Sequence, residues 1–555
     1  MESRAAVGLG LAVVKRLSGC SGLLHRRGEG PGGQWDRDAG ASARDGADHL
    51  KETEMMSQTG SSPQAPAFKP PFDMSGHWDG EGIQAAFQNA RHQPWTLGYR
   101  SFDVESAQAG PVAVHGALPE GLRGTLFRTG PALHDMGGQR YAHRWDGDGL
   151  LQAFRLRDEG VTHQARYLHT EKYLREKAAG KRLVSGFGTH VAGSRNLPEP
   201  MDEMNAGNIN IVPCAGEMLA LWEPGSAYRV DPNTLDTLGV KTWRDDLKGA
   251  AFSAHPRRMP DGTMWNFGCV AAEGLVRVFH VSASGALIDV HTLAIPHSAT
   301  LHDFAVTSRH LVFLAPPLAL SPERLRAGLP FGAACEWRPS LGLRVVVVDL
   351  RDWSEQRFEL PASNVFHIGN AWEDDDGVIR LDCMRDDQPR AMLAGWTLMK
   401  GEYRHHGGTR MTLITIDTCK GSIDCQTRED LEGEYPVVAS EEIGQRYRQV
   451  VFARRSAQRD PGVPGFDQIA SFDVEEGAVD VYDYGAGWLV EEHVIASDRH
   501  VPGQRWVIGS ALDLLEQQTV LSVFNAGALH AGPVMQARLP YALPLGLHGS
   551  FVADD

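Results

Sequence analysis

The chain has 555 residues, with 54 Lys and Arg against 70 Asp and Glu, which gives a formal net charge of −16. This acidic balance argues against a broad basic surface, so we expect no nucleic acid among the partners. No apolar run approaches the roughly 18 residues of a membrane span, and the purest run, Val345 to Val348, is typical of a buried strand. The seven cysteines form no CxxC pair, which favours a reduced, cytoplasmic protein.

The first segment, residues 1–93, differs in composition from the rest of the chain. It is rich in Gly, Ser, Arg and Pro, as in RRGEGPGGQWDRDAG and SQTGSSPQAPAFKPP, and it has little hydrophobic periodicity. Such a segment cannot bury enough apolar surface to offset the entropy cost of ordering, so we predict a disordered tail over 1–93. As an alternative, translation begins at Met55 or Met56 and residues 1–55 are an overextension of the start.

Short apolar or alternating runs recur over residues 94–555, separated by Gly, Pro, Asp and Asn. Examples are GTLFRTG, LVRVFHVSASG, LRVVVVDLRD and TLITIDT. Alternation with a period of two, interrupted by turn residues roughly every ten positions, is typical of all-β proteins. The rhythm predicts an all-β domain over 94–555 and leaves both an array of sandwiches and a propeller open.

Four of the 23 histidines stand at the ends of predicted strands: His255 in FSAHPRR, His302 in TLHDFAV, His367 in VFHIGNAWED and His548 in PLGLHGSF. They are far apart in the sequence, but a closed propeller would bring such residues together around one metal ion. Imidazole binds Fe, Cu, Zn or Ni, so the ligand type leaves the metal open. The adjacent His405 and His406 lie in a polar RHHGG loop, which a solvated turn explains better than a metal site.

Three glutamates occupy apolar surroundings: Glu223 in LALWEPG, Glu434 in GEYPVV and Glu492 in LVEEHVIA. A buried carboxylate requires a hydrogen-bond donor, because burial without one is costly. The second ring nitrogen of a metal-bound histidine would serve as that donor. On the residues alone, a salt bridge or an exposed position explains these glutamates better.

Several segments together resemble the carotenoid cleavage oxygenase family. They are LPEGLRGTLFRTGP, YAHRWDGDGLLQAFRL, ARYLHTEKYLREKAAGK, NAGNINIV, FSAHPR, LHDFAV, VFHIGNAWED, EYPVV and LPLGLHGSF. They follow the family's order from about Leu118 to Val552, and they are most similar to the motifs of the bacterial apocarotenoid 15,15′-oxygenases. The resemblance implies a seven-bladed β-propeller with a cap of loops and short helices over the metal face.

The resemblance also implies a site with one non-haem Fe(II) ion per chain. Its metal ligands would be His255, His302, His367 and His548, and three of them would be oriented by Glu223, Glu434 and Glu492. Glu491 is the alternative to Glu492, because this chain reads EEHVIAS where the family reads GEPVFVP. Other departures leave the four histidines intact: Thr129 for Asn, Leu150 for Met, and Ile209 for a Thr near the iron.

The activity that the resemblance implies is cleavage of a C=C bond by O2. A carotenoid or apocarotenoid would be split into two carbonyl products that take both oxygen atoms, and the alkene supplies the electrons. A stilbene-cleaving enzyme of the same family is the alternative, in which Tyr141 and Lys172 would hold a 4-hydroxyl group; otherwise Lys172 is an exposed surface residue. A non-catalytic propeller that binds lipid or polyene is a second alternative, which the retained histidines and glutamates argue against.

Residues 316–337, PPLALSPERLRAGLPFGAACEW, align with a membrane-contacting patch of the apocarotenoid enzymes. The candidates for this peripheral contact are the apolar Leu318, Leu320, Leu325, Leu329 and Phe331, with Arg324 and Arg326 able to meet lipid headgroups. The alternative is a helical cap that packs on its own propeller.

Overall fold

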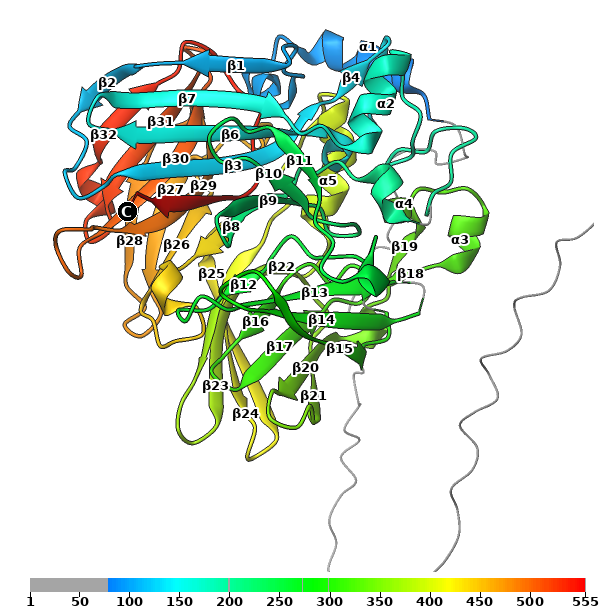
Figure 1. The fold of residues 1–555 in the computed structure, drawn as a ribbon, viewed down its shortest axis with the longest axis vertical. Coiled ribbons are helices and arrows are strands. Elements are labelled where there is room, and N and C mark those ends of the chain that lie inside the picture. The colour runs from blue at the N-terminus through cyan, green and yellow to red at the C-terminus, as the bar shows by residue number, and fades with distance from the viewer. Residues whose placement is uncertain (1–77, 198–199, 272, 298, 555) are drawn as a thin grey trace, which may run out of the picture. The chain divides into compact units, whose positions relative to one another are not determined.

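The computed structural model describes residues 78–554, apart from 198–199, 272 and 298. Antiparallel strands are the main regular secondary structure of this part of the chain and are arranged in several sheets (Figure 1). The prediction of a mostly β protein is therefore confirmed. Among the described helices, none combines the length and the apolar character needed to cross a membrane.

Two sheets are built from both ends of the described chain. One has the order β1-β7-β6-β3-β33, with β1 Ser106–Ala109, β3 Gly124–Leu133, β6 Asp148–Arg157, β7 Gly160–Tyr167 and β33 Gly549–Ala553. The other has the order β2-β32-β31-β30-β29, with β2 Ala113–Gly116, β29 Trp488–Ser497, β30 Arg505–Asp513, β31 Gln518–Asn525 and β32 Pro533–Arg538. Figure 1 shows these blue and red strands side by side, so the C-terminal strands close sheets that begin near the N-terminus.

Three four-stranded sheets follow in chain order. They are β8 Asn210–Cys214, β9 Glu217–Leu221, β10 Tyr228–Val230 and β11 Thr237–Val240; β12 Arg257–Arg258, β13 Met264–Val270, β14 Leu275–Val281 and β15 Leu287–Ala294; and β16 Phe304–Val306, β17 His310–Ala315, β20 Leu343–Asp349 and β21 Glu355–Leu360. The run Val345 to Val348 lies in β20 and is buried on both faces, which explains why it lacks alternation.

A seven-stranded sheet joins β22 Asn364–Glu373, β23 Val378–Asp386, β24 Arg410–Asp417, β25 Ser422–Val437, β26 Gln449–Arg454, β27 Gln468–Asp473 and β28 Val479–Asp483. The long strand β25 changes partner along its length. Its first part pairs with β24, as Thr427 with Thr412, and its last part pairs with β26, as Gly433 with Arg454. The sheet is therefore divided within β25 into two four-stranded halves.

The helices gather on one side of the sheets in the view of Figure 1. They are α1 Gly80–Ala90, α2 Glu171–Ala179, α3 Pro322–Arg326, α4 Phe331–Ala334 and α5 Arg390–Met399, with the short strand pairs β4 Asp135–Met136 and β5 Gln139–Arg140, and β18 Leu318–Leu320 and β19 Cys335–Trp337. Single 3-10 turns are η1 Pro94–Tyr99, η2 Arg144–Asp146, η3 Met201–Met204, η4 Asp245–Leu247, η5 Pro339–Leu341, η6 Ser440–Glu442 and η7 Leu529–Ala531.

Helix α1 lies inside the segment 1–93 that composition predicts to be a disordered tail. Asp79 caps the helix, with its Oδ1 accepting a hydrogen bond from the Gly82 amide at 2.8 Å. Ile83 and Phe87 bury one helix face, and the Arg140 guanidinium lies 3.6 Å from the centre of the Phe87 ring. The ordered chain thus starts before residue 94, because two apolar residues four apart suffice to dock one helix. Residues 1–77 of the predicted tail, including Met55 and Met56, lie outside the described residues.

Candidate metal centre

The four histidines come from four different sheets. His255 and His302 each lie two residues before an edge strand, β12 and β16, and His548 directly precedes the edge strand β33. His367 lies within the edge strand β22. The sequence therefore positions three imidazoles just before an edge strand and the fourth within one, and the backbone of each of these strands is held by its sheet on one side only.

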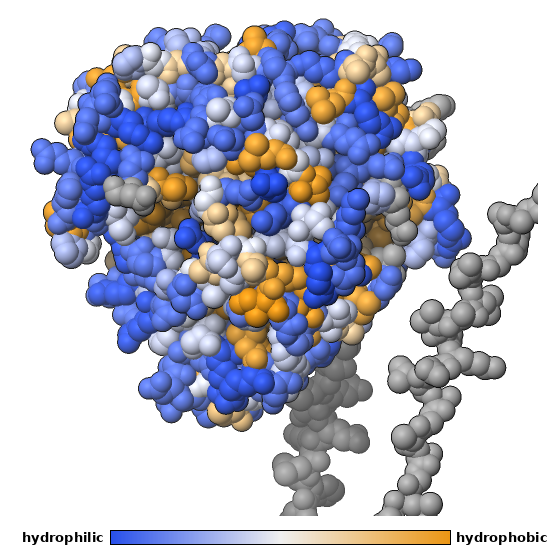
Figure 2. All heavy atoms as spheres, viewed as in Figure 1, coloured by the Kyte–Doolittle hydropathy of each residue, from blue (hydrophilic) through white to orange (hydrophobic). Residues whose placement is uncertain are grey.

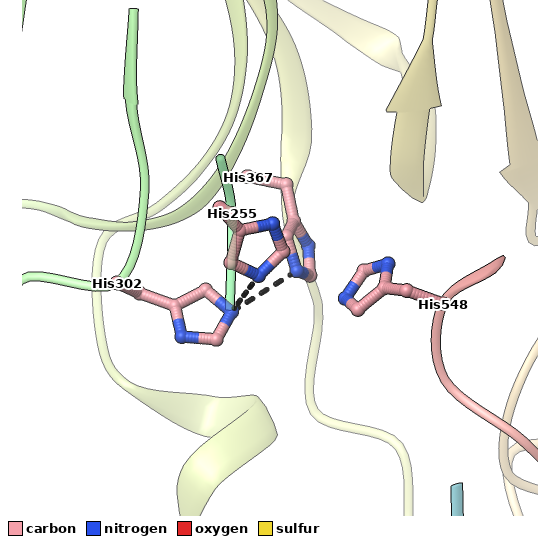
Figure 3. A group of neighbouring side chains, drawn as sticks. All are labelled: His255, His302, His367 and His548. Atoms are coloured by element: carbon pink, nitrogen blue, oxygen red, sulfur yellow. Dashed lines mark hydrogen bonds between the residues drawn. The ribbon is translucent and has the colours of Figure 1, made fainter. Parts of the chain in front are cut away.

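The four imidazole rings point toward one another (Figure 3). The Nε2 atom of His302 lies 3.0 Å from Nε2 of His255 and 3.2 Å from Nε2 of His367. One nitrogen from each of the four rings, His548 included, lies within 4.8 Å of the others. Metal–nitrogen bonds to histidine are about 2.1 Å long, and two such bonds at a right angle place their nitrogens about 3 Å apart. The observed separations therefore fit nitrogens that share one metal ion. Four nitrogen donors suit a transition metal rather than Mg²⁺ or Ca²⁺.

Burial and neighbouring charges shift the pKa values of three of the four rings. Burial, followed by the three neighbouring imidazoles, lowers the pKa of His255 well below its usual value. Burial also lowers the pKa of His548, against the effect of Glu492. For His367, burial would lower the pKa, but the Glu434 carboxylate outweighs it and raises the pKa. A neutral imidazole is the form that donates its lone pair to a metal, and His255 and His548 are held in that form.

Three carboxylates contact the outer ring nitrogens of three histidines. Glu492 Oε1 lies 2.7 Å from His548 Nδ1, and the other two pairs are His367 with Glu434 and His302 with Glu223. A carboxylate at Nδ1 holds the proton there and leaves the Nε2 lone pair directed at the centre. Among the residues that the structure describes, no carboxylate lies within ion-pair distance of His255.

The structure distinguishes the neighbours Glu491 and Glu492. Glu492 lies against His548 and also accepts a hydrogen bond from the Gly549 amide at 2.8 Å. Glu491 instead accepts from the Gly546 amide at 2.5 Å and lies 3.5 Å from the Arg128 guanidinium. Both carboxylates are buried. Each therefore fixes the backbone beside His548, but only Glu492 contacts the ring.

Glu223 differs from its expected position. It lies in a turn after β9, beyond the bridge between Trp222 and Phe252, and its side chain is 33% exposed. Its apolar surroundings in the sequence predict a more buried position, such as Glu434 has in β25 and Glu492 has in β29. The more exposed Glu223 is the carboxylate with the weakest desolvation, so its charge is the most screened of the three.

Replacing Glu492 with Gln is expected to lower the metal affinity by roughly 10- to 100-fold, the usual effect of losing a carboxylate that orients a ligand. Glutamine keeps the size and an acceptor oxygen but removes the charge. The matched control is Glu373→Gln, because Glu373 forms the same type of pair with His310, at 2.7 Å, in a buried position outside the metal site. Titration of both proteins with Co(II) measures the effect; equal affinities would contradict the role of Glu492.

An aromatic wall extends from the metal site toward the helices. Phe366 lies edge-on to the His302 ring, with the ring centres 5.2 Å apart, and its ring centre is 5.5 Å from that of Trp145. The ring centres of Trp145 and Phe187 are 5.0 Å apart, and those of Phe187 and Phe331 of α4 are 5.9 Å apart. These residues surround the buried Trp396 of α5. Sequence reasoning missed this wall, although Phe366 directly precedes the ligand His367.

Two of the three departures from the family motifs lie beside the ligand His548. The backbones of Thr129 and Ile209 hold the segment around His548: the Thr129 amide donates to the His548 carbonyl at 3.1 Å, and the His548 amide donates to the Ile209 carbonyl at 3.2 Å. These bonds use main-chain atoms, so they tolerate a change of side chain. Leu150 is fully buried in β6.

Tyr141 and Lys172 are both fully buried. The Lys172 ammonium lies 2.6 Å from Asp148 Oδ1 and 5.0 Å from the centre of the Tyr141 ring. The Tyr141 hydroxyl donates a hydrogen bond to Glu176 Oε2 at 3.0 Å. The interpretation of Lys172 as an exposed surface residue is therefore wrong. The two side chains do lie together, with their polar ends engaged by carboxylates.

Segment 316–337 forms β18, α3, α4 and β19. Leu318 is buried, and Leu320, Leu329 and Phe331 pack against the core cluster that contains Trp396. These side chains thus pack at least partly on the protein itself, which favours the alternative of a cap on its own fold, while Leu320, Leu329 and Phe331 stay partly exposed. Arg324 is also used internally, since it pairs with Glu336 at 3.1 Å. On the face drawn in Figure 2, hydrophobic residues form separate patches among hydrophilic ones.

The comparisons with known proteins agree with this geometry. The family model described as "Retinal pigment epithelial membrane protein" (RPE65) matches residues 100–553. The chain is 27% identical to the apocarotenoid-15,15′-oxygenase of Synechocystis sp. over 482 residues, which is 83% of this chain and 96% of that protein. It is 26% identical to resveratrol cleavage oxygenase 1 of Aspergillus fumigatus, with 79% and 91% covered, and to lignostilbene-α,β-dioxygenase isozyme III of Sphingomonas paucimobilis, with 79% and 92% covered.

A solved structure is similar over almost its whole length. The crystal structure of the cobalt-substituted Synechocystis apocarotenoid oxygenase matches with a TM-score of 0.75 at 25% identity, and the match covers 83% of this chain and 99% of that one. The family model, the relatives and the clustered histidines thus lead to one conclusion: the chain belongs to the RPE65/carotenoid cleavage oxygenase family and carries a four-histidine metal site.

Proposed function

We propose that this protein is a non-haem iron dioxygenase that cleaves a C=C bond of a carotenoid or apocarotenoid into two carbonyl products. The observation that carries the proposal is the group of four imidazoles, three of them backed by the carboxylates Glu223, Glu434 and Glu492. A bound Fe(II) ion would supply the activation of O2. The donor set is neutral, so the three glutamates provide the negative charge that compensates the cation.

The protein's own part in the reaction is positioning and the exclusion of water. The rings of Phe366 and Trp145 present an apolar surface next to His302, which suits a polyene better than a polar substrate. A polyene held along this wall would place one double bond beside the ligands. The position of the cleaved bond would then depend on how far the polyene substrate can extend toward Phe187 and α4.

We further propose that the sheets are the blades of a seven-bladed propeller with the helices as its cap. The division of β25 into two pairing segments supports this count, since it separates the seven-stranded sheet into two blades. Pairing of β33 with β3, and of β2 with β32, supports a ring closed by both chain ends. The four ligands on edge strands of different sheets are then expected at the axis.

Cleavage of a hydroxystilbene is the second candidate function. It is supported by the contact between Lys172 and the Tyr141 ring and by relatives named for resveratrol and lignostilbene cleavage. A lysine beside a tyrosine could hold a phenolic hydroxyl, which would enrich the alkene in electrons. Both polar groups already bind carboxylates in the structure, so the apocarotenoid proposal remains the first.

The deciding experiment is one assay with two substrate classes. Protein reconstituted with Fe(II) in detergent is incubated with apocarotenals and, in parallel, with hydroxystilbenes under O2, and the products are identified by mass spectrometry. Short polyene aldehydes are the expected result, and benzaldehyde-type products would support the stilbene function. Protein that binds iron but releases no product from either class would support a non-catalytic, polyene-binding protein and overturn the proposal.

We place the protein in the cytoplasm, with peripheral membrane contact through 316–337. The composition supports the location, and the solubility of polyenes in membranes supports the contact. Because most apolar side chains of this segment pack internally, the contact would involve the half-buried Leu325 and the exposed Arg326 of α3. Unchanged binding of a Leu325→Ser variant to liposomes would contradict this part of the proposal.

A further inference from the structure

A small cavity of about 140 Å³ lies beside the metal site. His255, His367 and His548 line it, together with residues that lie two positions after a ligand, such as Arg257 and Gly369. Asp303, the residue after His302, also lines it. Arg257 and Asp303 therefore form charged walls of this cavity, one or two residues from two ligands.

Arg257 and Asp303 form a buried ion pair. The Arg257 Nη2 atom lies 2.8 Å and 2.7 Å from the two carboxylate oxygens of Asp303, and the two side chains are only 12% and 2% exposed. Arg257 follows His255 by two residues, and Asp303 follows His302 by one. The pair therefore ties the strand entrances of two metal ligands together.

The same pair also holds the strand of a third ligand. Arg257 donates to the carbonyl oxygens of Ile368 at 2.7 Å and Gly369 at 3.0 Å, and its Nε donates to the Phe304 carbonyl at 2.8 Å. Asp303 Oδ2 accepts a hydrogen bond from the Ile368 amide at 2.8 Å. Ile368 directly follows His367, so both partners of the ion pair contact the backbone next to that ligand.

We propose that Arg257 and Asp303 are positioning residues that set the mutual distances of His255, His302 and His367. Strands β12, β16 and β22 belong to three different sheets, and among the described residues no backbone ladder joins these sheets to each other. The spacing of the three imidazoles therefore depends on side-chain links between the strands. A planar guanidinium with several donors in fixed directions can bind acceptors of two other strands at once, here of β16 and β22 from β12, which a lysine cannot do.

This inference rests on the proposed function for its consequence, because the set distances matter only if the imidazoles share a metal ion. A change in their spacing of a few tenths of an ångström would alter the ligand field and weaken binding, since the first coordination sphere tolerates little displacement. Arg257 and Asp303 would act on the distances between the imidazoles, whereas the carboxylates at Nδ1 act on the orientation of single rings.

The test measures Co(II) binding by titration and by the visible absorption of the bound ion. Asp303→Asn keeps the size of the side chain but replaces an acceptor of Arg257 or of the Ile368 amide by an NH2 group. We expect at least a tenfold weaker affinity and a changed absorption spectrum. The milder Arg257→Lys keeps the charge, and we expect a smaller change in the same direction; it decides the test if Asp303→Asn fails to fold.

The matched control is Asp349→Asn. Asp349 forms another Arg–Asp pair in the sheet of β16, β17, β20 and β21, with Arg309 at 3.0 Å. Among the described residues, it contacts none that adjoins a metal ligand. We expect it to lower the melting temperature while leaving the Co(II) affinity within twofold and the spectrum unchanged. Folded Asp303→Asn or Arg257→Lys protein with the affinity and spectrum of the parent overturns the inference. A parent protein that binds no Co(II) or Fe(II) contradicts instead the proposed function.

Discussion

Replacing His367 with Ala is expected to abolish metal binding and product formation together. Removal of an orienting carboxylate usually costs roughly 10- to 100-fold in metal affinity, and loss of a direct ligand costs more. His255→Ala should have the same effect on the metal, since the Nε2 atoms of both residues lie close to that of His302. Elemental analysis of the purified proteins and the product assay measure the outcome. Iron retained at one equivalent per chain in either variant would contradict the four-histidine site.

The two variants should differ in the stability of the metal-free protein. His367 pairs with Glu434, so its removal leaves a buried carboxylate for which the described residues provide one donor, the Tyr435 amide at 2.7 Å. An unsatisfied buried group costs about 1–3 kcal/mol, so His367→Ala should lower the free energy of unfolding by that amount more than His255→Ala does. His255 has no carboxylate partner among the described residues and leaves none behind. Urea unfolding of the apo-proteins compares the two.

The ligands could be predicted from the sequence, but their supporting contacts could not. Each histidine lies in a short motif that carries the family resemblance, and a metal site requires only that the motifs be brought together. The ion pair of Arg257 and Asp303 joins residues 46 positions apart. Its further partners, Ile368 and Gly369, contribute backbone carbonyl oxygens, which every residue has, so the sequence does not indicate these contacts. Both charged residues stood in quoted motifs, FSAHPRR and LHDFAV, next to the histidines.

Local irregularity explains the other differences between prediction and structure. The choice between Glu491 and Glu492 depends on a register shift of β29 between Val490 and His493, which breaks the simple alternation of strand faces. Helix α2, EKYLREKAA, has the composition of a solvated helix, yet Lys172 and Glu176 are fully buried because opposite charges surround them. Composition predicts exposure well only where no such network compensates the charge.

Lys172→Met is expected to lower the free energy of unfolding by about 3–5 kcal/mol, the usual cost of breaking a buried ion pair from one side. Lys172 lies 2.6 Å from Asp148 and 3.5 Å from Glu176, and Arg182 lies 3.0 Å from both carboxylates. Two cations and two anions balance in this cluster, and Met leaves one negative charge uncompensated. The control is Lys177→Met on the same helix, where the side chain is 51% exposed and the expected change is below about 0.5 kcal/mol.

The pH dependence of the stability difference between the parent protein and Lys172→Met follows from Glu176. Burial would raise the pKa of its carboxyl, but Lys172 and Arg182 outweigh burial and lower the pKa to about 2. Stabilisation from a lowered carboxyl pKa is fully present above the usual value of 4.5 and is lost as the pH falls toward 2. The gap between parent and Lys172→Met should therefore be largest near neutral pH and shrink below pH 4.5. Urea unfolding at pH 7 and pH 3 checks the sign, and a gap that widens in acid would contradict the network.

The same variant also separates the two candidate functions. If Lys172 only supports the fold, folded Lys172→Met protein should process apocarotenals and hydroxystilbenes with kcat/KM values reduced by the same factor. If Lys172 holds a phenolic hydroxyl, kcat/KM for the hydroxystilbene should fall by a further tenfold or more, because about 1.4 kcal/mol of binding to the reacting state is lost. The contacts with Asp148 and Glu176 favour the first outcome, since a lysine already engaged by two carboxylates would have to leave one of them to bind a substrate.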